Sequence, residues 1–267
     1  MERVGLLAGI GRLPVECAKA ATAMGYEVYA VALLPDTDKE LADCVADYRE
    51  ISIAHLDDIL NYLKDNDIHK VTMLGKVTKE LLFAGNVQPD ARMLKLIMSL
   101  PDRKDDTIMM MFVRELASIG VQAFDQTALL HKLMPHRGTL SKREPTEEEK
   151  ADMEFGIRMA RELGRLDVGQ TVVVKNKAVM ALEAIEGTDA CIRRGGQLAR
   201  EGAVVAKVAK PQQDNRFDVP TVGVQTLQTM IEVHAAALVI EADKTLLVDR
   251  DKVLALADEN GIAVVAM

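Results

Sequence analysis

Short apolar runs alternate with amphipathic segments along the first half of the chain. The runs predict buried strands, and apolar residues at helical spacing between them predict covering helices. The predicted strands are residues 4–8, 26–34, 51–53, 70–74 and 121–124, and the predicted helices are residues 14–24, 56–63, 91–100 and 108–119. Strands and helices that alternate in this way indicate an α/β fold with a doubly wound, Rossmann-like parallel sheet.

The α/β pattern stops at residues 135–145, where two prolines and a glycine interrupt it. Thr146 and Glu149 then form a capping-box pattern, which predicts the start of a helix. We therefore predict two domains, residues 1–134 and residues 138–267, and the second domain restarts the α/β pattern.

In the second domain, β-branched residues at 171–174 predict a strand, and apolar residues at 178–185 predict a helix that ends at Gly187. Glu183 and Glu186 would then share a face of the last helical turn, where the helix dipole disfavours negative charge. Such a conflict is typical of a functional site or of a compensating cation nearby. Further strands are predicted at residues 203–208, 236–240, 245–248 and 262–265. Further helices are predicted to begin at Thr188, to span residues 225–233, and to begin at about residue 251.

Composition narrows the function. The 267 residues carry a net charge of −8, which argues against a nucleic-acid-binding protein, because such proteins need a basic surface. Cys17, Cys44 and Cys191 are widely spaced and form no CxxC pair, so we expect buried thiols in a reducing compartment. The apolar run near the N-terminus is too short for a signal peptide or a membrane span, so we expect a soluble, cytoplasmic protein.

Two glycine-containing turns follow predicted strands of the first domain. Gly9, Ile10 and Gly11 lead into a helix N-terminus, an arrangement that can hold a phosphate. The turn departs from the dinucleotide fingerprint at the third glycine position, so a tight turn without a ligand is an alternative, and a nucleotide-dependent oxidoreductase is a rival function. Gly75 and Lys76 follow another strand, on the ligand side of a parallel sheet, unless Lys76 is only a solvated surface residue.

The polar residues 207–220 follow a buried strand, where α/β proteins usually carry their chemistry. In an extended backbone, Asp214, Arg216 and Asp218 point to the same side. The two carboxylates could then share Mg²⁺, and Arg216 could hold a phosphate through two hydrogen bonds. Lys210 lies at the edge of this loop and is a further candidate phosphate contact. A structural network of the same aspartates and arginine explains the cluster equally well.

Five stretches carry a resemblance to a known family: residues 5–14, 74–77, 166–170, 183–189 and 207–220. They resemble the UDP-2,3-diacylglucosamine diphosphatase family of lipid A synthesis, in its two-domain, Mg²⁺-dependent form. The resemblance covers nearly the whole chain, and the last two stretches are long and unusual in composition. It implies an active site in a cleft between the two domains, a homodimer, and hydrolysis of UDP-2,3-diacylglucosamine to UMP and 2,3-diacylglucosamine 1-phosphate.

The resemblance also implies roles for particular residues when water attacks the α-phosphorus. Asp214 or Asp218 would bind Mg²⁺ or activate the water, and the sequence does not choose between them. Arg216 and Lys210 would stabilise the charge on the diphosphate, and Asp189 is a further candidate metal ligand. The candidates for substrate contacts are Gly9, Ile10, Gly11, Gly75, Lys76, Glu183, Glu186, Thr188 and Gln213.

A lipid substrate requires an apolar site and implies transient contact with the inner face of the cytoplasmic membrane. Met109, Met110 and Met111 begin a strongly apolar helix and are one candidate, although a Met-rich core helix is the favoured interpretation. A protein that binds the UDP-sugar without hydrolysing it is a second rival, and such a protein would release no UMP.

Overall fold

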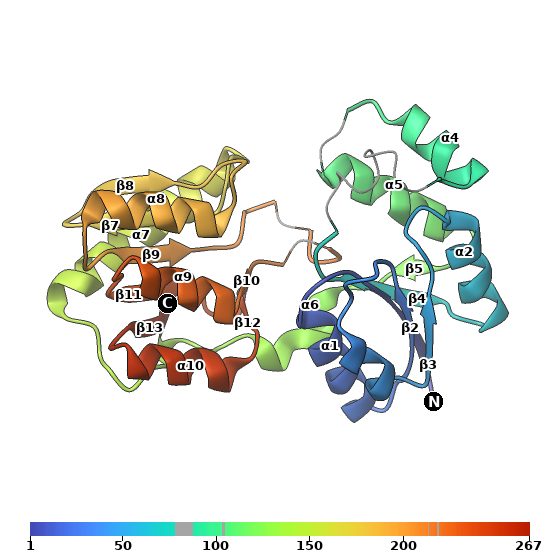
Figure 1. Cartoon of the computed structure of the whole chain (residues 1–267), viewed down its shortest axis with the longest axis horizontal. Helices are drawn as coiled ribbons and strands as arrows, with labels where there is room; N and C mark the ends of the chain where they lie inside the picture. The colour runs from blue at the N-terminus through green and yellow to red at the C-terminus, as the bar shows by residue number, and fades with distance from the viewer. Residues whose placement is uncertain (78–87, 103–104, 213, 218) are drawn as a thin grey trace. The chain divides into compact units, whose positions relative to one another are not determined.

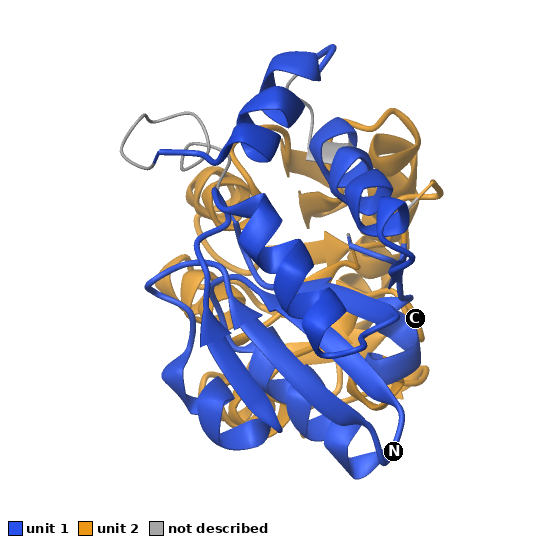
Figure 2. Ribbon diagram, turned by 90° about the vertical axis from the view of Figure 1, so that its right-hand side faces the viewer, with its two compact units in different colours: residues 1–130, 215–217 blue, residues 131–214, 218–267 orange. Residues whose placement is uncertain are grey.

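The computed structural model describes residues 1–77, 88–102, 105–212, 214–217 and 219–267. The chain forms two compact units, coloured separately in Figure 2: unit 1 comprises residues 1–130 and 215–217, and unit 2 comprises residues 131–214 and 218–267. Unit 1 combines helices with a parallel sheet and unit 2 combines helices with a mixed sheet, which confirms the predicted α/β class. The predicted cleft between the domains stays a prediction.

Unit 1 is built on a five-stranded parallel sheet with the strand order β3-β2-β1-β4-β5. The strands are β1 (Arg3–Ala8), β2 (Glu27–Ala32), β3 (Asp47–Glu50), β4 (Lys70–Leu74) and β5 (Gln122–Ala123). The helices are α1 (Leu13–Ala23), the 3₁₀ helix η1 (Lys39–Cys44), α2 (Leu56–Asp65), α4 (Ala91–Ser99), α5 (Asp105–Ser118) and α6 (Gln126–Leu130). Figure 1 shows α1 and α6 on one side of this sheet and α2 on the other, so the sheet is doubly wound, as predicted.

One strand of unit 1 differs from the prediction. The third strand, expected at residues 51–53, is β3, which lies just before them and has a half-exposed, polar sequence. It is one of the two edge strands of the sheet, and its polar residues give no apolar signal. Ile51 and Ile53 follow it and donate backbone hydrogen bonds to the carbonyls of Ala32 and Leu33, both at 3.1 Å.

Unit 2 contains a six-stranded mixed sheet with the order β6-β13-β11-β9-β7-β8 and a separate two-stranded sheet of β10 and β12. The strands are β6 (Gly138–Thr139), β7 (Thr171–Lys175), β8 (Ala178–Leu182), β9 (Val204–Lys207), β10 (Thr221–Val222), β11 (Ala237–Ile240), β12 (Leu246–Leu247) and β13 (Ala263–Ala266). The helices are α7 (Glu147–Arg165), α8 (Thr188–Ala199), α9 (Val224–Glu232) and α10 (Arg250–Glu259), with the 3₁₀ helix η2 (His131–Leu133) before them. Strands β9, β11 and β13 are parallel, and β8 runs parallel to them because both β7 pairings are antiparallel.

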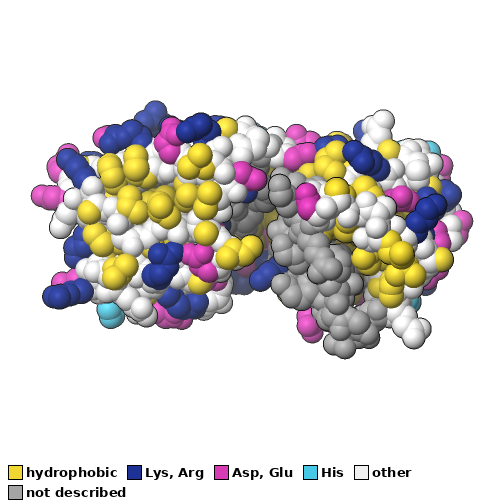
Figure 3. All heavy atoms as spheres, turned by 90° about the horizontal axis from the view of Figure 1, so that it is seen from above, with side chains coloured by type: hydrophobic (Ala, Val, Ile, Leu, Met, Phe, Trp, Pro, Cys, Tyr) yellow, Lys and Arg dark blue, Asp and Glu magenta, His cyan; other side chains and the backbone are white. Residues whose placement is uncertain are grey.

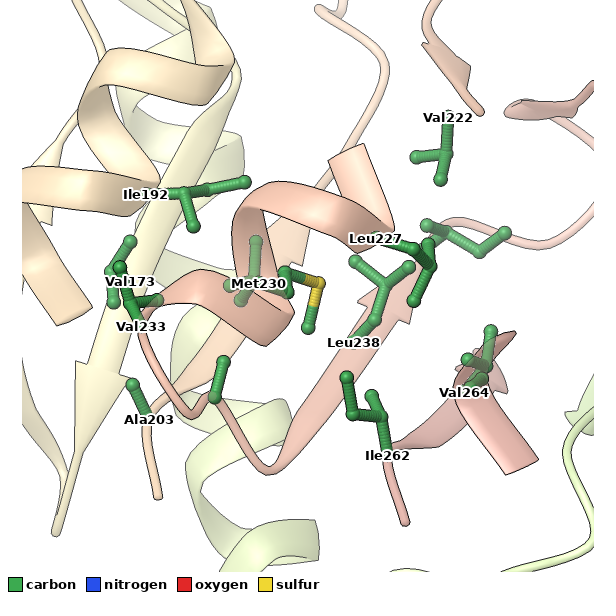
Figure 4. Close-up of a cluster of buried hydrophobic side chains, with 14 of the residues drawn as sticks. Val173, Ile192, Ala203, Val222, Leu227, Met230, Val233, Leu238, Ile262 and Val264 are labelled. Atoms are coloured by element: carbon green, nitrogen blue, oxygen red, sulfur yellow. The ribbon is translucent and has the colours of Figure 1, made fainter. Parts of the chain in front are cut away.

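The strands of unit 2 alternate between two cores. Val173 and Val205 face α8, α9 and α10, in the cluster drawn in Figure 4. Val172 and Val204 face α7 on the opposite side of the sheet. The predicted capping box at the start of α7 is confirmed, because Thr146 and Glu149 exchange both hydrogen bonds.

The helix predicted at residues 178–185 is wrong, because residues 178–182 form strand β8. Asn176 and Lys177 both have positive φ, 52° and 56°, as a two-residue hairpin turn requires. The carboxylate of Asp152 on α7 accepts hydrogen bonds from both of their backbone N–H groups, at 2.8 and 2.6 Å. This tertiary contact outweighs the helical spacing of the apolar residues that follow.

Gly187 does not end a helix either: it is the N-cap of α8 and has φ of 81°. The helix then continues through Gly195 and Gly196. A Cβ atom at Gly195 would lie 2.5 Å from Val173, so glycine is needed where α8 packs closely on β7.

The cysteines follow the prediction only in part. Cys17 and Cys191 are buried, and burial raises the pKa of each thiol to about 12. Cys44 is only half-buried, so the expectation of a buried side chain is wrong there. Among the described residues, no helix combines the length and the hydrophobicity needed to cross a bilayer.

Candidate active site

The two glycine turns of unit 1 lie side by side at the carboxyl ends of β1 and β4. Ile10 and Lys76 form a backbone bridge, with N–H to carbonyl distances of 2.9 and 2.8 Å. The Gly9 N–H donates to the Leu74 carbonyl at 2.8 Å, and a Cβ at Gly75 would lie 2.7 Å from the Gly9 backbone. Glycine is thus required where these two turns approach each other. The predicted contact of both turns with the nucleotide stays a prediction.

Beside these turns, unit 1 contains a partly open apolar cavity of about 210 Å³. It lies among the ends of β1, β2 and β4, helices α2 and α5, and one side chain from the segment 215–217. Apart from Gly75, every lining residue is hydrophobic: Leu7, Leu33, Ile53, Leu56, Ile59, Met73, Leu74, Val77, Ile108, Met109, Phe112, Leu116 and Phe217. A dry cavity of about 150 Å³ with a similar lining is known to bind benzene. This cavity therefore has room for an apolar group of at least that size.

Residues 215–217 belong to unit 1, although they come from the polar segment of the second half. They form a turn, so the extended backbone assumed for residues 214–218 is wrong, and the alternation argument that aligned Asp214, Arg216 and Asp218 does not hold. The Asn215 carbonyl accepts a hydrogen bond from the Gln126 N–H at 3.0 Å.

The charged residues of this segment have contacts of their own. Arg216 Nη2 lies 3.3 Å from Met110 Sδ, and the guanidinium carbon lies 5.8 Å from the Phe217 ring centroid. Lys210 forms an ion pair with Asp167 at 2.8 Å. Asp214 is half-buried, whereas Gln213 and Asp218 lie outside the described residues. The catalytic roles of these residues stay predictions.

A buried ionic network occupies the carboxyl ends of β8 and β9 in unit 2. Glu183 and Lys207 are only 7% and 6% exposed. The Thr188 hydroxyl donates to Glu183 Oε1 at 2.9 Å and accepts from Lys207 Nζ at 3.1 Å. Lys207 Nζ also donates to the Thr221 carbonyl at 2.8 Å. The network thus brings together residues 183–189 and 207–220, two of the stretches that carry the family resemblance.

A third such stretch, residues 166–170, reaches the same place. The Gln170 N–H donates to Glu183 Oε2 at 3.2 Å, and the Val208 N–H donates to the Gln170 carbonyl at 3.1 Å. A Cβ at Gly169 would lie 2.2 Å from the Glu183 carbonyl oxygen, so only glycine allows this approach. Three stretches separated in sequence therefore converge on Glu183.

Glu186 and Asp189 flank this network. Glu186 is not in a helix, so the predicted conflict with a helix dipole is wrong, although the compensating cation exists. Backbone N–H groups, together with the Arg194 guanidinium, lower the pKa of Glu186. Asp189 lies in the first turn of α8, where the helix dipole favours a carboxylate.

Three residues with distinctive surroundings were not among the predicted site residues: Lys207, Glu241 and Phe217. Lys207 is a lone charge inside an apolar run, and that position already indicated a buried lysine. Glu241 directly follows β11 and is 5% exposed. Burial raises the pKa of Glu241, but hydrogen bonds from Lys244, Arg161 and the Ala209 N–H outweigh it and lower the pKa. Phe217, an aromatic residue in a polar segment, lines the apolar cavity.

The described part of the chain contains no group of three His, Cys, Asp or Glu side chains placed to hold a metal ion. Mg²⁺ needs fewer protein ligands than this, because it is often bound by one or two carboxylates, several waters and the phosphates of a substrate. Asp214 and Asp189 offer the carboxylate oxygens that such a site uses. Mg²⁺ stays a prediction.

The chain has only low sequence identity and low structural similarity to the solved structures it matches. UDP-glucose-4-epimerase of Stenotrophomonas maltophila, with bound NAD and formylated UDP-arabinopyranose, is 12% identical with a TM-score of 0.32, over 46% of this chain and 35% of the epimerase. Glycinamide-RNase-transformylase T of Mycobacterium tuberculosis is 13% identical with a TM-score of 0.27, over 69% and 44%. TM-scores this low support no conclusion about this protein.

Comparison with known sequences identifies the family of this chain. Models of the LpxI N-terminal domain and the LpxI C-terminal domain match residues 3–133 and 136–265. The chain is 34% identical to the UDP-2,3-diacylglucosamine pyrophosphatase LpxI of Caulobacter vibrioides over 278 residues, which cover 100% of this chain and 98% of that protein. The chain therefore belongs to the LpxI family.

Proposed function

We propose that this protein hydrolyses the diphosphate of UDP-2,3-diacylglucosamine to UMP and 2,3-diacylglucosamine 1-phosphate in lipid A biosynthesis. The observation that carries the proposal is the full-length identity of 34% to a protein named UDP-2,3-diacylglucosamine pyrophosphatase. Two features of the structure support it. Unit 2 gathers charged residues at the ends of its parallel strands, and unit 1 contains an apolar cavity, as a substrate with a diphosphate and acyl chains requires.

The chemistry is an attack of water on the α-phosphorus. The bond between that phosphorus and the bridging oxygen breaks, UMP keeps the water oxygen, and the sugar 1-phosphate leaves with the bridging oxygen. Asp214 or Asp218 accepts the proton of the water, as a general base. Lys210 and Arg216 stabilise the negative charge that develops on the diphosphate.

Mg²⁺ belongs to this proposal as the cofactor. Asp214, Asp218 and Asp189 are its proposed ligands, since carboxylate oxygens suit this hard cation. When bound, the ion would neutralise negative charge on the diphosphate.

We place the end of an acyl chain in the apolar cavity of unit 1. About 210 Å³ is too little for two long chains, so most of the lipid would lie outside it. Each buried methylene contributes about 0.8 kcal/mol, which corresponds to about fourfold in affinity. Substrates with shorter chains should therefore lose kcat/KM stepwise, until the chain no longer reaches the cavity.

Release of UMP from UDP-2,3-diacylglucosamine, with and without a chelator, tests the function. We expect UMP release that stops with the chelator and returns with added Mg²⁺. Binding of the UDP-sugar without UMP release would instead support the rival, a non-catalytic binding protein. Release that continues in excess chelator would remove Mg²⁺ from the proposal and leave the hydrolysis.

We also propose that the protein acts in the cytoplasm as a homodimer and touches the inner membrane transiently. Strand β8 supports the homodimer, because it is the last strand of its sheet among the described residues, and a strand of a second copy could pair along such an edge. Apolar side chains gather on the face of unit 2 that carries β8 and α8 (Figure 3), with Leu182 43% and Ile185 94% exposed.

Light scattering of the wild type and of Leu182→Asp tests the homodimer. A wild-type dimer that the substitution converts to a monomer supports this surface, and a dimer that persists excludes it. Flotation with vesicles of bacterial phospholipid tests the membrane contact separately. Binding to the vesicles supports the contact, and protein that stays in the soluble fraction contradicts it.

A further inference from the structure

We propose that Lys207 is a positioning residue for the proposed hydrolysis. Its ammonium group joins both ends of residues 208–220 and attaches them to the start of α8. This role rests on the proposed function, because residues 208–220 include the residues to which the chemistry is assigned.

The first part of the evidence is the position of Lys207 in the chain. Lys207 is the last residue of β9, and Thr221 is the first residue of β10. These two residues bracket the segment 208–220, and Lys207 Nζ donates to the Thr221 carbonyl at 2.8 Å. A single side chain therefore closes the whole segment into a loop.

The second part is the attachment of this loop to α8. The same ammonium group donates to the Thr188 hydroxyl at 3.1 Å, and that hydroxyl donates to Glu183 at 2.9 Å. Thr188 is the first residue of α8, and Glu183 follows β8. The ammonium, the hydroxyl and the carboxylate thus form one chain of hydrogen bonds between the ends of β8 and β9.

The third part is burial. A charged side chain that is 6% exposed loses its hydration, and a protein retains it only with good partners or for a function. Lys207 belongs to one family-like stretch and donates to Thr188 in another, whereas a neutral hydrogen-bond donor could have joined Thr221 alone. The charge is needed because Glu183, 7% exposed, lies at the other end of the chain of hydrogen bonds.

Lys175 shows what a purely structural lysine does in the same unit. It is the last residue of β7, which runs antiparallel to β9, so it lies at the opposite end of the strands from Lys207, and it donates to the carbonyls of Ala199 and Glu201 at 3.1 and 2.6 Å. Its partners lie outside all five stretches with the family resemblance. Lys175→Met is therefore a matched control, because it removes the same group from the same unit and also breaks bonds to backbone carbonyls.

The experiment measures UMP release from UDP-2,3-diacylglucosamine by the full-length wild type, Lys207→Met and Lys175→Met. We expect Lys207→Met to lower kcat at least 100-fold while KM changes less than about threefold, because the loss falls on the placement of the reacting groups and not on overall affinity. Lys175→Met should keep kcat within about threefold, even where its melting temperature falls as far as that of Lys207→Met.

Chemical rescue separates placement of the ammonium from general stability. In Lys207→Ala, added butylammonium should raise kcat at least tenfold at constant ionic strength, and tetramethylammonium, which donates no hydrogen bond, should not. Equal losses of kcat in the two methionine variants, or equal rescue by both cations, would overturn the role of Lys207.

Two further measurements keep the test decisive. If the wild type releases no UMP, the proposed function has failed, and hydrogen exchange of peptides covering residues 208–222 then tests the loop closure alone. Exchange should be faster in Lys207→Met than in the wild type and unchanged in Lys175→Met, and unchanged exchange in both would contradict the closure. If Lys207→Met does not fold, Thr188→Val replaces it, since this change breaks the same chain of hydrogen bonds at its neutral member.

Discussion

The two units bring the carboxyl ends of parallel strands together and fill that edge with opposite chemistry. In unit 1 the edge holds two glycine turns in backbone contact and an apolar cavity. In unit 2 it holds buried Glu183, Lys207 and Glu241, each with charged or hydroxyl partners. The layers are alike, so the difference lies in the few residues that follow the strands. Function in such folds depends on those residues and not on the architecture.

The largest expected effect tests whether the chemistry belongs to the polar segment 208–220. Asp214→Ala and Asp218→Ala, made separately, should differ. Removal of the carboxylate that activates water should lower kcat about 10³-fold, which corresponds to about 4 kcal/mol in the activation barrier. UMP release under saturating substrate is the measurement. Exposed Asp251 serves as the control, since Asp251→Ala should leave kcat unchanged. Normal rates in both variants would show that the active site was assigned to the wrong residues.

The next effect tests the backbone contact that characterises unit 1. Gly75 and Gly25 have nearly the same φ, 91° and 89°, but a Cβ at Gly75 meets the Gly9 backbone at 2.7 Å and one at Gly25 meets nothing within 4 Å. Gly25→Ala should cost about 1 kcal/mol in the free energy of unfolding, from φ alone. Gly75→Ala should cost about 2–4 kcal/mol, because overpacking adds to it. Urea unfolding gives both values, and equal losses would mean that the two turns can move apart without cost.

A smaller effect tests the apolar cavity. Phe217→Leu and Phe112→Leu enlarge it from two different elements, so each should shift the ratio of kcat/KM for long and short acyl chains by about threefold to tenfold. Phe155→Leu changes an aromatic residue of unit 2 and should leave the ratio unchanged. A ratio that neither cavity variant alters would place the acyl chains elsewhere.

The smallest effect concerns an exposed ion pair of unit 1, whose charges, unlike the buried charges of unit 2, remain in contact with water. Hydrogen bonds from Arg12, and then from Lys19, lower the pKa of Glu40 to about 2 from an ordinary value near 4.5. The stabilisation by Glu40 is therefore fully present above about pH 5 and is lost as the pH falls towards 2. Because the side chains are exposed, the advantage of the wild type over Glu40→Gln should be small at pH 7 and vanish near pH 2. Urea midpoints at a series of pH values measure it, and an advantage that grows in acid would reverse the assigned sign.

Sequence patterns located most elements because one face of each is buried. Strands β1, β4, β9 and β13 and helices α1, α2, α7 and α9 lie where apolar periodicity predicts them. The pattern failed at two edge strands, β3 and β8. Strand β3 is polar and gives no apolar signal, whereas β8 is apolar but its spacing predicted a helix. At β8 a hairpin turn held by Asp152 decided between strand and helix, and that contact joins residues 24 positions apart.

The amino-acid sequence by itself determined the α/β class and, through five distinctive stretches, the family of this protein. It could not determine which of those stretches meet. Only the tertiary structure brought residues 166–170, 183–189 and 207–220 together around Glu183, and it alone assigned Phe217 to the apolar cavity of unit 1. The physical reason is that periodicity reports on burial along one element. Hydrogen bonds between the ends of different strands depend on the order in which the sheet assembles them.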